Sequence, residues 1–293
     1  MAGSRTMASI ALHLAQDIQM KVTADDIRLV IRSLSLSGLP LCVHSSLRSF
    51  GWVEGGAQAA VDGFLAEGCT VLVPTFSWDE FGLPPQPGMQ PTRNGCNYAI
   101  TDRPAPGKGR IYRPDSMVID RGDMGAIPAA VVAMPRRVRG NHPLCSFTAV
   151  GPLAEELMAG QEALEVFRPL RALSEAGGYV VLMGVGLEAM TLIHLAEQMA
   201  GRNLFRRWAN GPDGRPMEVE TGGCSLGFGK FSSIFAPLTR QTKVGLSTWN
   251  VIAATEALAV AIRAIQDNAN ITHCGDPECG RCDDAVMGGP LVG

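Results

Sequence analysis

A histidine and a glutamate stand three positions apart within residues 190–200, at His194 and Glu197. The surrounding residues are good helix formers, so both side chains are expected on one face of a helix. An imidazole beside a carboxylate is suited to accepting a proton from an amine that attacks an acyl group. Taken alone, this spacing fits a surface contact or a hydrogen-bonded core histidine better than a catalytic pair.

The segments that precede this pair predict an α/β architecture. Residues 177–185 are apolar and flanked by glycines, which is typical of a buried strand, and the helix follows them directly. Upstream, a helix is expected from Thr23, with Thr23 as its N-cap, and a strand over 39–44. A helix over 55–66 and a strand over 69–74 continue the alternation. This order indicates a mixed, mostly parallel central sheet with helices on both faces.

The remainder of the chain continues this pattern with insertions. The further expected segments are helices near 126–134 and 153–158, an apolar segment near 146–151, mainly extended chain over 203–248 and a helix over 250–266. Residues 79–125 are rich in proline and glycine and predict a loop-rich insertion over the site. With no repeat or convincing linker, residues 1–293 are expected to form a single α/β domain that ends in a cysteine-rich tail over 268–293.

Composition restricts the class of protein. Of the 293 residues, 46% are hydrophobic and 18% charged, which is typical of a compact globular enzyme. The net charge of −3 without a basic run disfavours nucleic acid as a partner. The sequence shows no apolar stretch long enough for a membrane span and no secretory signal pattern at its start. We therefore expect a cytoplasmic protein, a monomer or a homodimer, with free thiols at its scattered cysteines.

Residues 43–56 form a polar loop between a predicted strand and a predicted helix. In parallel α/β sheets this junction is where ligands bind, and backbone donors there favour anionic groups. Two serines, an arginine and two glycines give the loop hydroxyl donors, one cation and close backbone approach. A cofactor that carries phosphate would suit it, although on composition alone an ordinary polar loop fits equally well.

Four motifs occur in order along the chain, at residues 44–56, 73–79, 141–152 and 194–197. Together they closely resemble the aminoglycoside 3-N-acetyltransferase family of antibiotic-resistance enzymes, and the resemblance extends over residues 22–285. It implies a fold distinct from the GNAT acetyltransferases. It also implies acetyl transfer from acetyl-coenzyme A to the 3-amino group of a 2-deoxystreptamine aminoglycoside.

The resemblance also implies roles for individual residues. His194 would act as the general base in a direct transfer, with Glu197 beside it on the substrate or the imidazole. Thr75 would donate its hydroxyl to the thioester oxygen. Residues implied on the cofactor side are Ser45, Ser46, Leu47, Arg48, Thr75, Phe76, His142 and Ser146. Residues implied on the cationic substrate are Asp79, Glu80 and Glu197. A simpler interpretation of His142, which precedes a proline, is that it caps a turn.

The tail places Cys274, Cys279 and Cys282 within ten residues, beside His273. This spacing could supply a tetrahedral structural zinc site, with Cys224 as a further ligand. The alternative is a reduced, tightly turned tail packed near Cys224. The sequence favours this metal-free tail and gives no reason to expect a catalytic metal.

Two other functions stay open from the sequence. One is an N-acetyltransferase of the same fold that acts on another amine, because Leu226 stands where some relatives carry an acidic residue. The other is a zinc-stabilised binding protein without catalysis. Retention of both His194 and Glu197 argues against the second.

Overall fold

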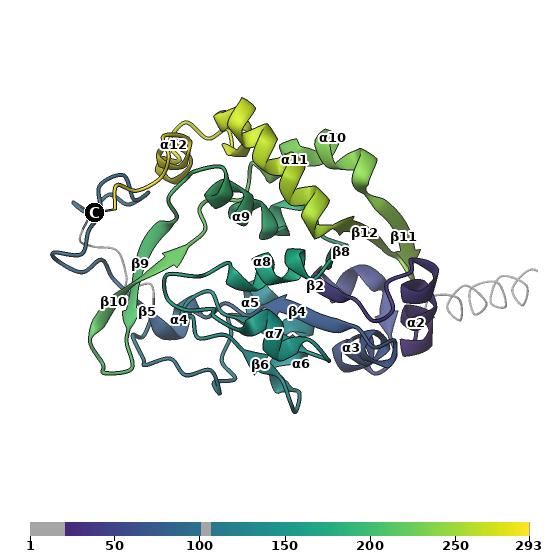
Figure 1. Ribbon diagram of the computed structural model, residues 1–293. Coiled ribbons are helices and arrows are strands. Elements are labelled where there is room, and N and C mark those ends of the chain that lie inside the picture. Colours follow the sequence, from purple (N-terminus) through teal and green to yellow (C-terminus); the bar gives the residue numbers. More distant parts are fainter. Residues whose placement is uncertain (1–20, 101–106, 293) are drawn as a thin grey trace, which may run out of the picture.

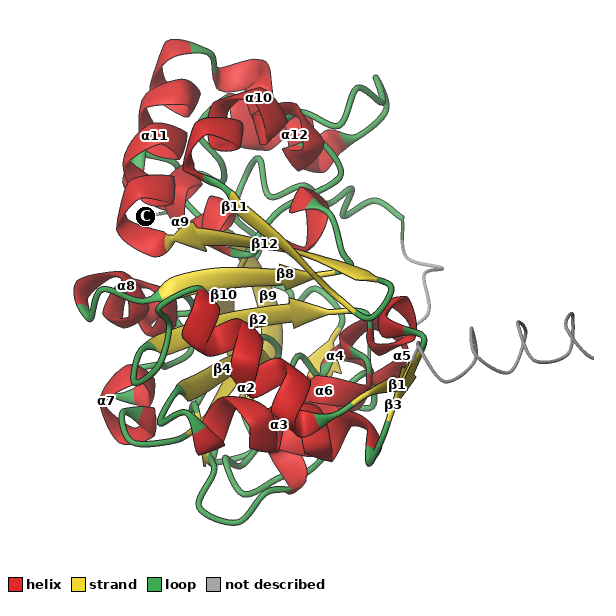
Figure 2. Ribbon diagram, turned by 90° about the vertical axis from the view of Figure 1, so that its right-hand side faces the viewer, coloured by secondary structure: helices red, strands yellow, loops and turns green. Residues whose placement is uncertain are grey.

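The computed structural model describes residues 21–100 and 107–292. Within these ranges the largest sheet has seven strands (Figures 1 and 2). These are β2 (Pro40–Ser45), β4 (Thr70–Pro74), β6 (Val138–Arg139), β7 (Phe147–Val150), β8 (Tyr179–Met183), β11 (Arg240–Val244) and β12 (Ser247–Ala253). Their order across the sheet is β11-β12-β8-β2-β4-β7-β6.

The directions of these strands differ between the centre of the sheet and its flanks. Strand β2 pairs in parallel with β4 and β8, whereas the outer pairings are antiparallel. The expectation of a mixed sheet is confirmed, but parallel pairing is confined to the three central strands. One cause is the turn at Gly245 and Leu246, which reverses the chain between β11 and β12. Gly245 has a φ of 59°, which glycine adopts without steric cost.

Helices cover both faces of the sheet, as expected. Those on one face are α2 (Ala24–Ser33), α3 (Gly56–Ala66) and α6 (Ala126–Ala133). Those on the other are α7 (Ala154–Met158), α8 (Arg168–Glu175), α9 (Leu192–Met199) and α11 (Ala254–Asp267).

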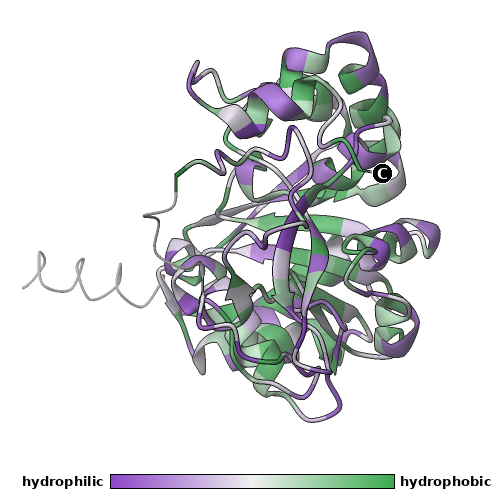
Figure 3. Cartoon of the chain, turned by 90° about the vertical axis from the view of Figure 1, so that its left-hand side faces the viewer, coloured by the Kyte–Doolittle hydropathy of each residue, from purple (hydrophilic) through white to green (hydrophobic). Residues whose placement is uncertain are grey.

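Successive side chains of a strand point to opposite faces, so each face has its own apolar core. Val71 and Val73 of β4 belong to the core under α2, α3 and α6, whereas Leu72 belongs to the core under α7, α8, α9 and α11. All three side chains are fully buried. Figure 3 shows the hydrophobic residues concentrated in these central strands. Burial on both faces explains why the strands read as continuous apolar runs.

The local sequence signals define most of the expected elements. Thr23 caps α2, where its hydroxyl accepts from the N–H of Asp26 at 3.2 Å and its own N–H donates to the Asp26 carboxylate at 2.8 Å. The expected helix over 250–266 begins at Ala254 instead, because residues 250–253 belong to β12 and pair with residues 179–182 of β8. Sheet pairing of β-branched residues here overrides helix propensity.

A second sheet of the described residues has three strands, β5 (Gly82–Leu83), β9 (Phe205–Asn210) and β10 (Pro216–Thr221). Strand β5 comes from the 79–125 insertion, and the insertion also contains α4 (Trp78–Phe81, at its start) and α5 (Arg121–Met124). The remaining short elements are β1 (Lys21–Val22), β3 (Trp52–Val53), α10 (Ser232–Phe235), α12 (Gly280–Val286) and the 3-10 turns η1 (Leu47–Phe50), η2 (Leu187–Ala189), η3 (Phe228–Phe231), η4 (Ala236–Leu238) and η5 (Ala269–Thr272).

The C-terminal tail lies against the insertion, at the end of the molecule that holds the small sheet (Figure 1). Asp284 of α12 accepts a hydrogen bond from the N–H of Gly95 at 2.6 Å. Thr92 and Leu291 form an antiparallel bridge. Among the helices described, none is long and apolar enough to cross a membrane.

Candidate active site

A cavity of about 600 Å³ opens at the carboxyl ends of β2, β4 and β8. Ser45 at the end of β2, Phe76 beyond β4 and Val185 beyond β8 line it. This is the edge where α/β sheets place their ligands, and the volume suits a small-molecule site. The cavity is also lined by Thr221 at the end of β10, by Gly222, Gly223 and Ser225 of the following loop, and by Arg281 of the tail.

His194 lines this cavity from α9 and is held by a buried chain of charged groups. Its Nδ1 lies 2.8 Å from Oε2 of Glu197, one helical turn away. Oε1 of Glu197 accepts from Nη1 of Arg202 at 2.6 Å. The three residues are at most 8% exposed. The attraction between the Glu197 carboxylate and the Arg202 guanidinium offsets part of the cost of burying both groups.

Aromatic rings and a glycine fix the orientation of the imidazole. The Phe167 ring is stacked at 6.0 Å, and the Phe228 ring meets His194 edge-on at 4.8 Å. A Cβ at Gly222 would lie 2.6 Å from Cδ2 of His194, so only glycine allows this close approach. The ring therefore has little freedom to leave the Glu197 carboxylate.

The connection from β8 to α9 explains how the pair reaches the cavity. Gly184 ends the strand with a φ of 66°, and its Cβ would lie 2.0 Å from the hydroxyl of Ser49. The chain then turns through η2 before α9 begins, so the first turns of the helix face the cavity. The sequence pattern of a strand, a glycine and a helix thus positions His194 where the sheet edge is open.

Of the residues implied on the cofactor side, Ser45 and Phe76 line the cavity. Ser46, Leu47 and Arg48 follow β2 but do not line it. Ser46 donates its backbone N–H to the carbonyl of Met183 at 2.9 Å. Arg48 is exposed in the 3-10 turn η1. The 43–56 segment therefore reaches the cavity through Val43, His44 and Ser45 at the end of β2, while its cation Arg48 does not line the cavity.

Thr75 and Ser146 form a buried hydrogen-bonded network beside the cavity. The Thr75 hydroxyl donates to the Ser146 carbonyl at 2.9 Å, and the Ser146 hydroxyl donates to the Thr75 carbonyl at 3.0 Å. Arg139 joins them through its Nε at 3.0 Å from the Ser146 hydroxyl. Both hydroxyl-bearing side chains are fully buried and neither lines the cavity. The Thr75 hydroxyl is thus engaged within the protein, with the Ser146 carbonyl and with the Thr148 hydroxyl at 2.9 Å.

Both ring nitrogens of His142 are engaged with backbone groups, as in the simpler interpretation that it caps a turn. The side chain is fully buried. Its Nδ1 accepts from the N–H of Cys145 at 2.9 Å, so the proton is on Nε2, which lies 2.8 Å from the carbonyl of Glu220. Burial lowers the pKa of His142 to about 4. This neutral ring fastens the 141–145 turn to β10.

Asp79 and Glu80, two of the acidic residues expected at the substrate, do not line the cavity. Glu80 is buried and pairs with Lys108 and Arg110, each at 2.8 Å, so it has no free charge for a substrate. Asp79 is exposed and does not line the cavity. The carboxylates that do line it belong to Asp123 of α5 and Glu188 of η2. Lys108 and Arg110 bind Glu80 because the insertion folds back over α4, a long-range contact that the sequence does not signal.

Other residues of the site were not found from the sequence. Arg202 follows α9 by three residues, and its contacts to Thr272 at 2.7 Å and Ala269 at 2.7 Å come from the far end of the chain. Arg207 and Arg281 line the cavity from β9 and α12. His44 also lines it, and burial lowers the pKa of His44 to about 4. Only the position of His44 at a strand end signalled a place near the site.

The fold and the site define an α/β protein with a histidine–carboxylate pair at the open edge of its sheet. A family model described as aminoglycoside 3-N-acetyltransferase matches residues 42–269. The chain belongs to this family. Its sequence is 32% identical over 169 residues to aminoglycoside N(3)-acetyltransferase IX of Micromonospora chalcea, covering 54% of each chain. The chain thus spans about half the length of the curated relatives it matches.

Solved structures share the fold over most of the chain. The aminoglycoside acetyltransferase AAC(3)-IVa, as apoenzyme, has a TM-score of 0.73 at 22% identity, covering 92% of this chain and 98% of that one. A mutant of that enzyme was solved in complex with a gentamicin. The acetyltransferase AAC-IIIb, in a binary complex with CoASH, has a TM-score of 0.66 at 21% identity, covering 84% and 97%. These identities carry the fold alone.

Proposed function

We propose that this protein transfers the acetyl group of acetyl-coenzyme A to the 3-amino group of a 2-deoxystreptamine aminoglycoside, and so confers resistance. The observation that carries the proposal is the buried chain from Arg202 through Glu197 to His194, which ends at the cavity. Family membership supports the reaction class. The complexes of relatives with a gentamicin and with CoASH support the two substrates.

The hydrogen bonds assign the proton positions on His194. The ionised Glu197 accepts, so Nδ1 carries the proton and donates it to Oε2. Nε2 is then the basic nitrogen, and no group in the described part of the chain hydrogen-bonds it. A base for an incoming amine needs this state: a fixed ring with a lone pair toward the ligand.

The transfer then proceeds in a direct displacement. The substrate amine attacks the thioester carbon, a C–N bond forms, and Nε2 of His194 accepts the amine proton. The C–S bond breaks, and the coenzyme A thiolate leaves and takes up that proton. Glu197 stabilises the imidazolium in between, and Arg202 holds the Glu197 carboxylate in place through its 2.6 Å contact. Holding both substrates in one cavity supplies the orientation, so no covalent enzyme intermediate is required.

The charges of the cavity fit a cationic substrate that meets an anionic cosubstrate. Asp123 and Glu188 offer carboxylates to the ammonium groups of an aminoglycoside. Ser45 and Phe76 are assigned to the pantetheine side, where they line the cavity beside the sheet. Arg48 stands outside, at a position suited to a coenzyme A phosphate. Because acetyl-coenzyme A is an intracellular metabolite, we place the reaction in the cytoplasm.

An assay of coenzyme A release against a panel of amines tests the proposal. The panel contains gentamicin, tobramycin, kanamycin, neomycin, apramycin and simple amines, with His194→Ala as the control for background hydrolysis. We expect release with at least one aminoglycoside and a product acetylated at N3 by NMR. Acetylation only of other amines would point to a different substrate. No release with any amine would overturn the assignment as an acetyltransferase.

A further inference from the structure

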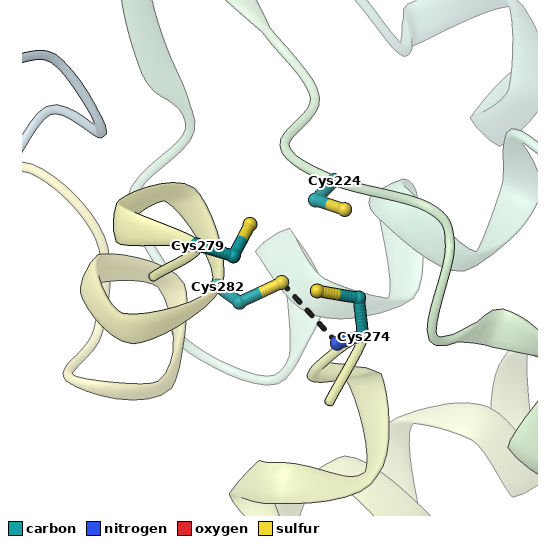
Figure 4. A group of neighbouring side chains, drawn as sticks. All are labelled: Cys224, Cys274, Cys279 and Cys282. Carbon is teal, nitrogen blue, oxygen red and sulfur yellow. Dashed lines mark hydrogen bonds between the residues drawn. The ribbon is translucent and has the colours of Figure 1, made fainter. Parts of the chain in front are cut away.

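The strongest feature outside the acetyl-transfer chemistry is a group of four cysteines. Cys224 lies in the loop after β10, Cys274 and Cys279 lie between η5 and α12, and Cys282 lies in α12. Their sulfur atoms all lie within 4.8 Å of one another. Figure 4 shows the four side chains gathered around one space, Cys224 from one part of the chain and the other three from another.

The spacing of the sulfurs fits one tetrahedral metal ion. With zinc–sulfur bonds of about 2.3 Å, the edge of a tetrahedral site measures about 3.8 Å. The observed limit of 4.8 Å allows this edge after small side-chain rotations. Clusters of several iron atoms hold their thiolate ligands farther apart than a single ion does. Four thiolates around a single ion are the ligand set of structural zinc sites.

The surroundings of the cysteines match those of metal thiolates. Cys224 and Cys282 are buried, and Cys274 and Cys279 are partly buried. The Sγ of Cys282 accepts a hydrogen bond from the backbone N–H of Cys274 at 3.3 Å, drawn as the dashed line in Figure 4. Such N–H donors orient and stabilise ligating sulfur atoms. Without a metal ion, four thiols packed this closely would stabilise the fold little, because a thiol is a weak hydrogen-bond partner.

His273, the other ligand that the sequence offered, is engaged elsewhere. Its Nε2 lies 3.1 Å from Oδ1 of Asp283, and its Nδ1 accepts from the N–H of Gly275 at 3.0 Å. Cys224 completes the set in its place. The fourth ligand therefore comes from the loop after β10, whereas the other three come from the tail.

We propose that Cys224, Cys274, Cys279 and Cys282 bind one structural zinc ion that joins the tail to the wall of the cavity. The sequence alone favoured a metal-free tail, and the convergence of four sulfurs reverses that preference. A site closed by four thiolates has no open position, so the ion does not take part in catalysis.

The position of the site gives the ion a mechanical role. Gly223 and Ser225, on either side of Cys224, line the cavity, as does Arg281 between Cys279 and Cys282. Phe228, four residues after Cys224, contacts the His194 ring. One ion thus fixes two chain segments that form one wall of the cavity. We expect its loss to loosen this wall as well as the tail.

Metal analysis of the full-length protein, purified under reducing conditions without chelator, tests the proposal. We expect about one zinc ion per chain, and X-ray absorption with sulfur scatterers at about 2.3 Å. Replacement by Co²⁺ should give the absorption bands of a tetrahedral thiolate site. Iron in place of zinc, disulfides among these cysteines, or a protein that stays metal-free after zinc addition would each overturn it.

Two variants and a matched control locate the site. Cys274→Ser and Cys279→Ser remove partly buried ligands and should lower the zinc affinity by more than about tenfold. Cys96→Ser changes a partly buried cysteine outside the group and should keep the full zinc content. Equal zinc content in all three variants would contradict this ligand set. Since wild-type stoichiometry and cobalt spectra need no variant, a misfolded variant leaves the test intact.

Discussion

His194 and His142 are both buried histidines, yet their hydrogen bonds differ in kind. His142 uses both ring nitrogens on the backbone, at Cys145 and Glu220. His194 uses one nitrogen on a carboxylate and turns the rest of its ring to a cavity. In the first arrangement both ring nitrogens are hydrogen-bonded, so neither can accept a proton from a ligand. The second fixes the ring and leaves it a lone pair, so the partners of a histidine decide its role.

Between the surroundings of His194 and those of His142, the largest expected effect is a loss of stability when Arg202 is replaced. In Arg202→Met the Glu197 carboxylate is left buried without its cation, which should reduce the free energy of unfolding by about 3–5 kcal/mol. Urea unfolding of the variant measures this loss. Adding Glu197→Gln to Arg202→Met removes the unpaired charge and should restore part of the stability. No recovery in the double variant would contradict a charge pair at this position.

Acidification should weaken the His142 region. Its pKa is lowered to about 4 in the folded protein from an ordinary value of 6.5, so the unfolded chain binds the proton more tightly. The contribution of the neutral His142 ring to the free energy of unfolding is fully present above pH 6.5. It is lost as the pH falls toward 4, a change of about 3 kcal/mol. His44 has the same shift and should contribute similarly. Unfolding experiments between pH 7 and pH 4 measure the slope.

A variant isolates the contribution of His142 to that slope. His142→Asn removes the titrating ring and keeps an oxygen for the N–H of Cys145. Its stability should depend on pH less steeply than that of the wild type, by about one proton between pH 6.5 and 4. An unchanged slope would show that His142 titrates normally in the folded protein.

Glu197→Gln should affect turnover more than substrate binding. The amide keeps the shape of the side chain but removes the charge that stabilises the imidazolium, so kcat should fall by about 10²-fold. The KM values for both substrates should change little. Steady-state kinetics, normalised to folded protein, measure both constants. A rise of KM with normal kcat would assign Glu197 to substrate binding instead.

The smallest expected effect is at the rim of the His194 cavity. Glu188→Gln removes one of its carboxylates and should raise the KM for an aminoglycoside by about fivefold, or about 1 kcal/mol. Glu175→Gln, an exposed residue of α8 that pairs with Arg168, is the matched control and should leave KM unchanged. Equal KM values in the two variants would remove Glu188 from the substrate site.

The sequence predicted those parts of the molecule that depend on local pattern. Apolar runs and caps located β2, β4, β8 and α2, and the helical spacing of His194 and Glu197 placed them on one face. Arg202 and Cys224 acquire their partners from residues 269–282, across the fold. Such contacts leave no periodic signal in the chain. The misplaced start of α11 has the same origin, because β12 is defined by its pairing with β8.

Thr75, Ser146 and Glu80 show that the sequence did not predict the orientation of side chains near the site. Thr75 and Ser146 lie within two of the four motifs, and Glu80 directly follows one. The sequence could not tell which of these side chains line the cavity and which bond within the protein. Their orientation depends on partners such as Arg139 and Lys108, which come from the 79–125 insertion and the segment after it. Where alternate residues face opposite sides, a position near the site does not imply contact with it.

The role of His194 as the base is tested by comparing the acetyl-transfer rates of His194→Ala and His142→Ala. Both rates are measured with the same accepted aminoglycoside and are normalised to folded protein. We expect a fall in kcat of about 10²–10⁴-fold for His194→Ala, with binding of acetyl-coenzyme A largely kept. For His142→Ala we expect reduced stability and near-normal kcat. Near-normal turnover in His194→Ala, or the larger loss in His142→Ala, would contradict the assignment of His194 as the base.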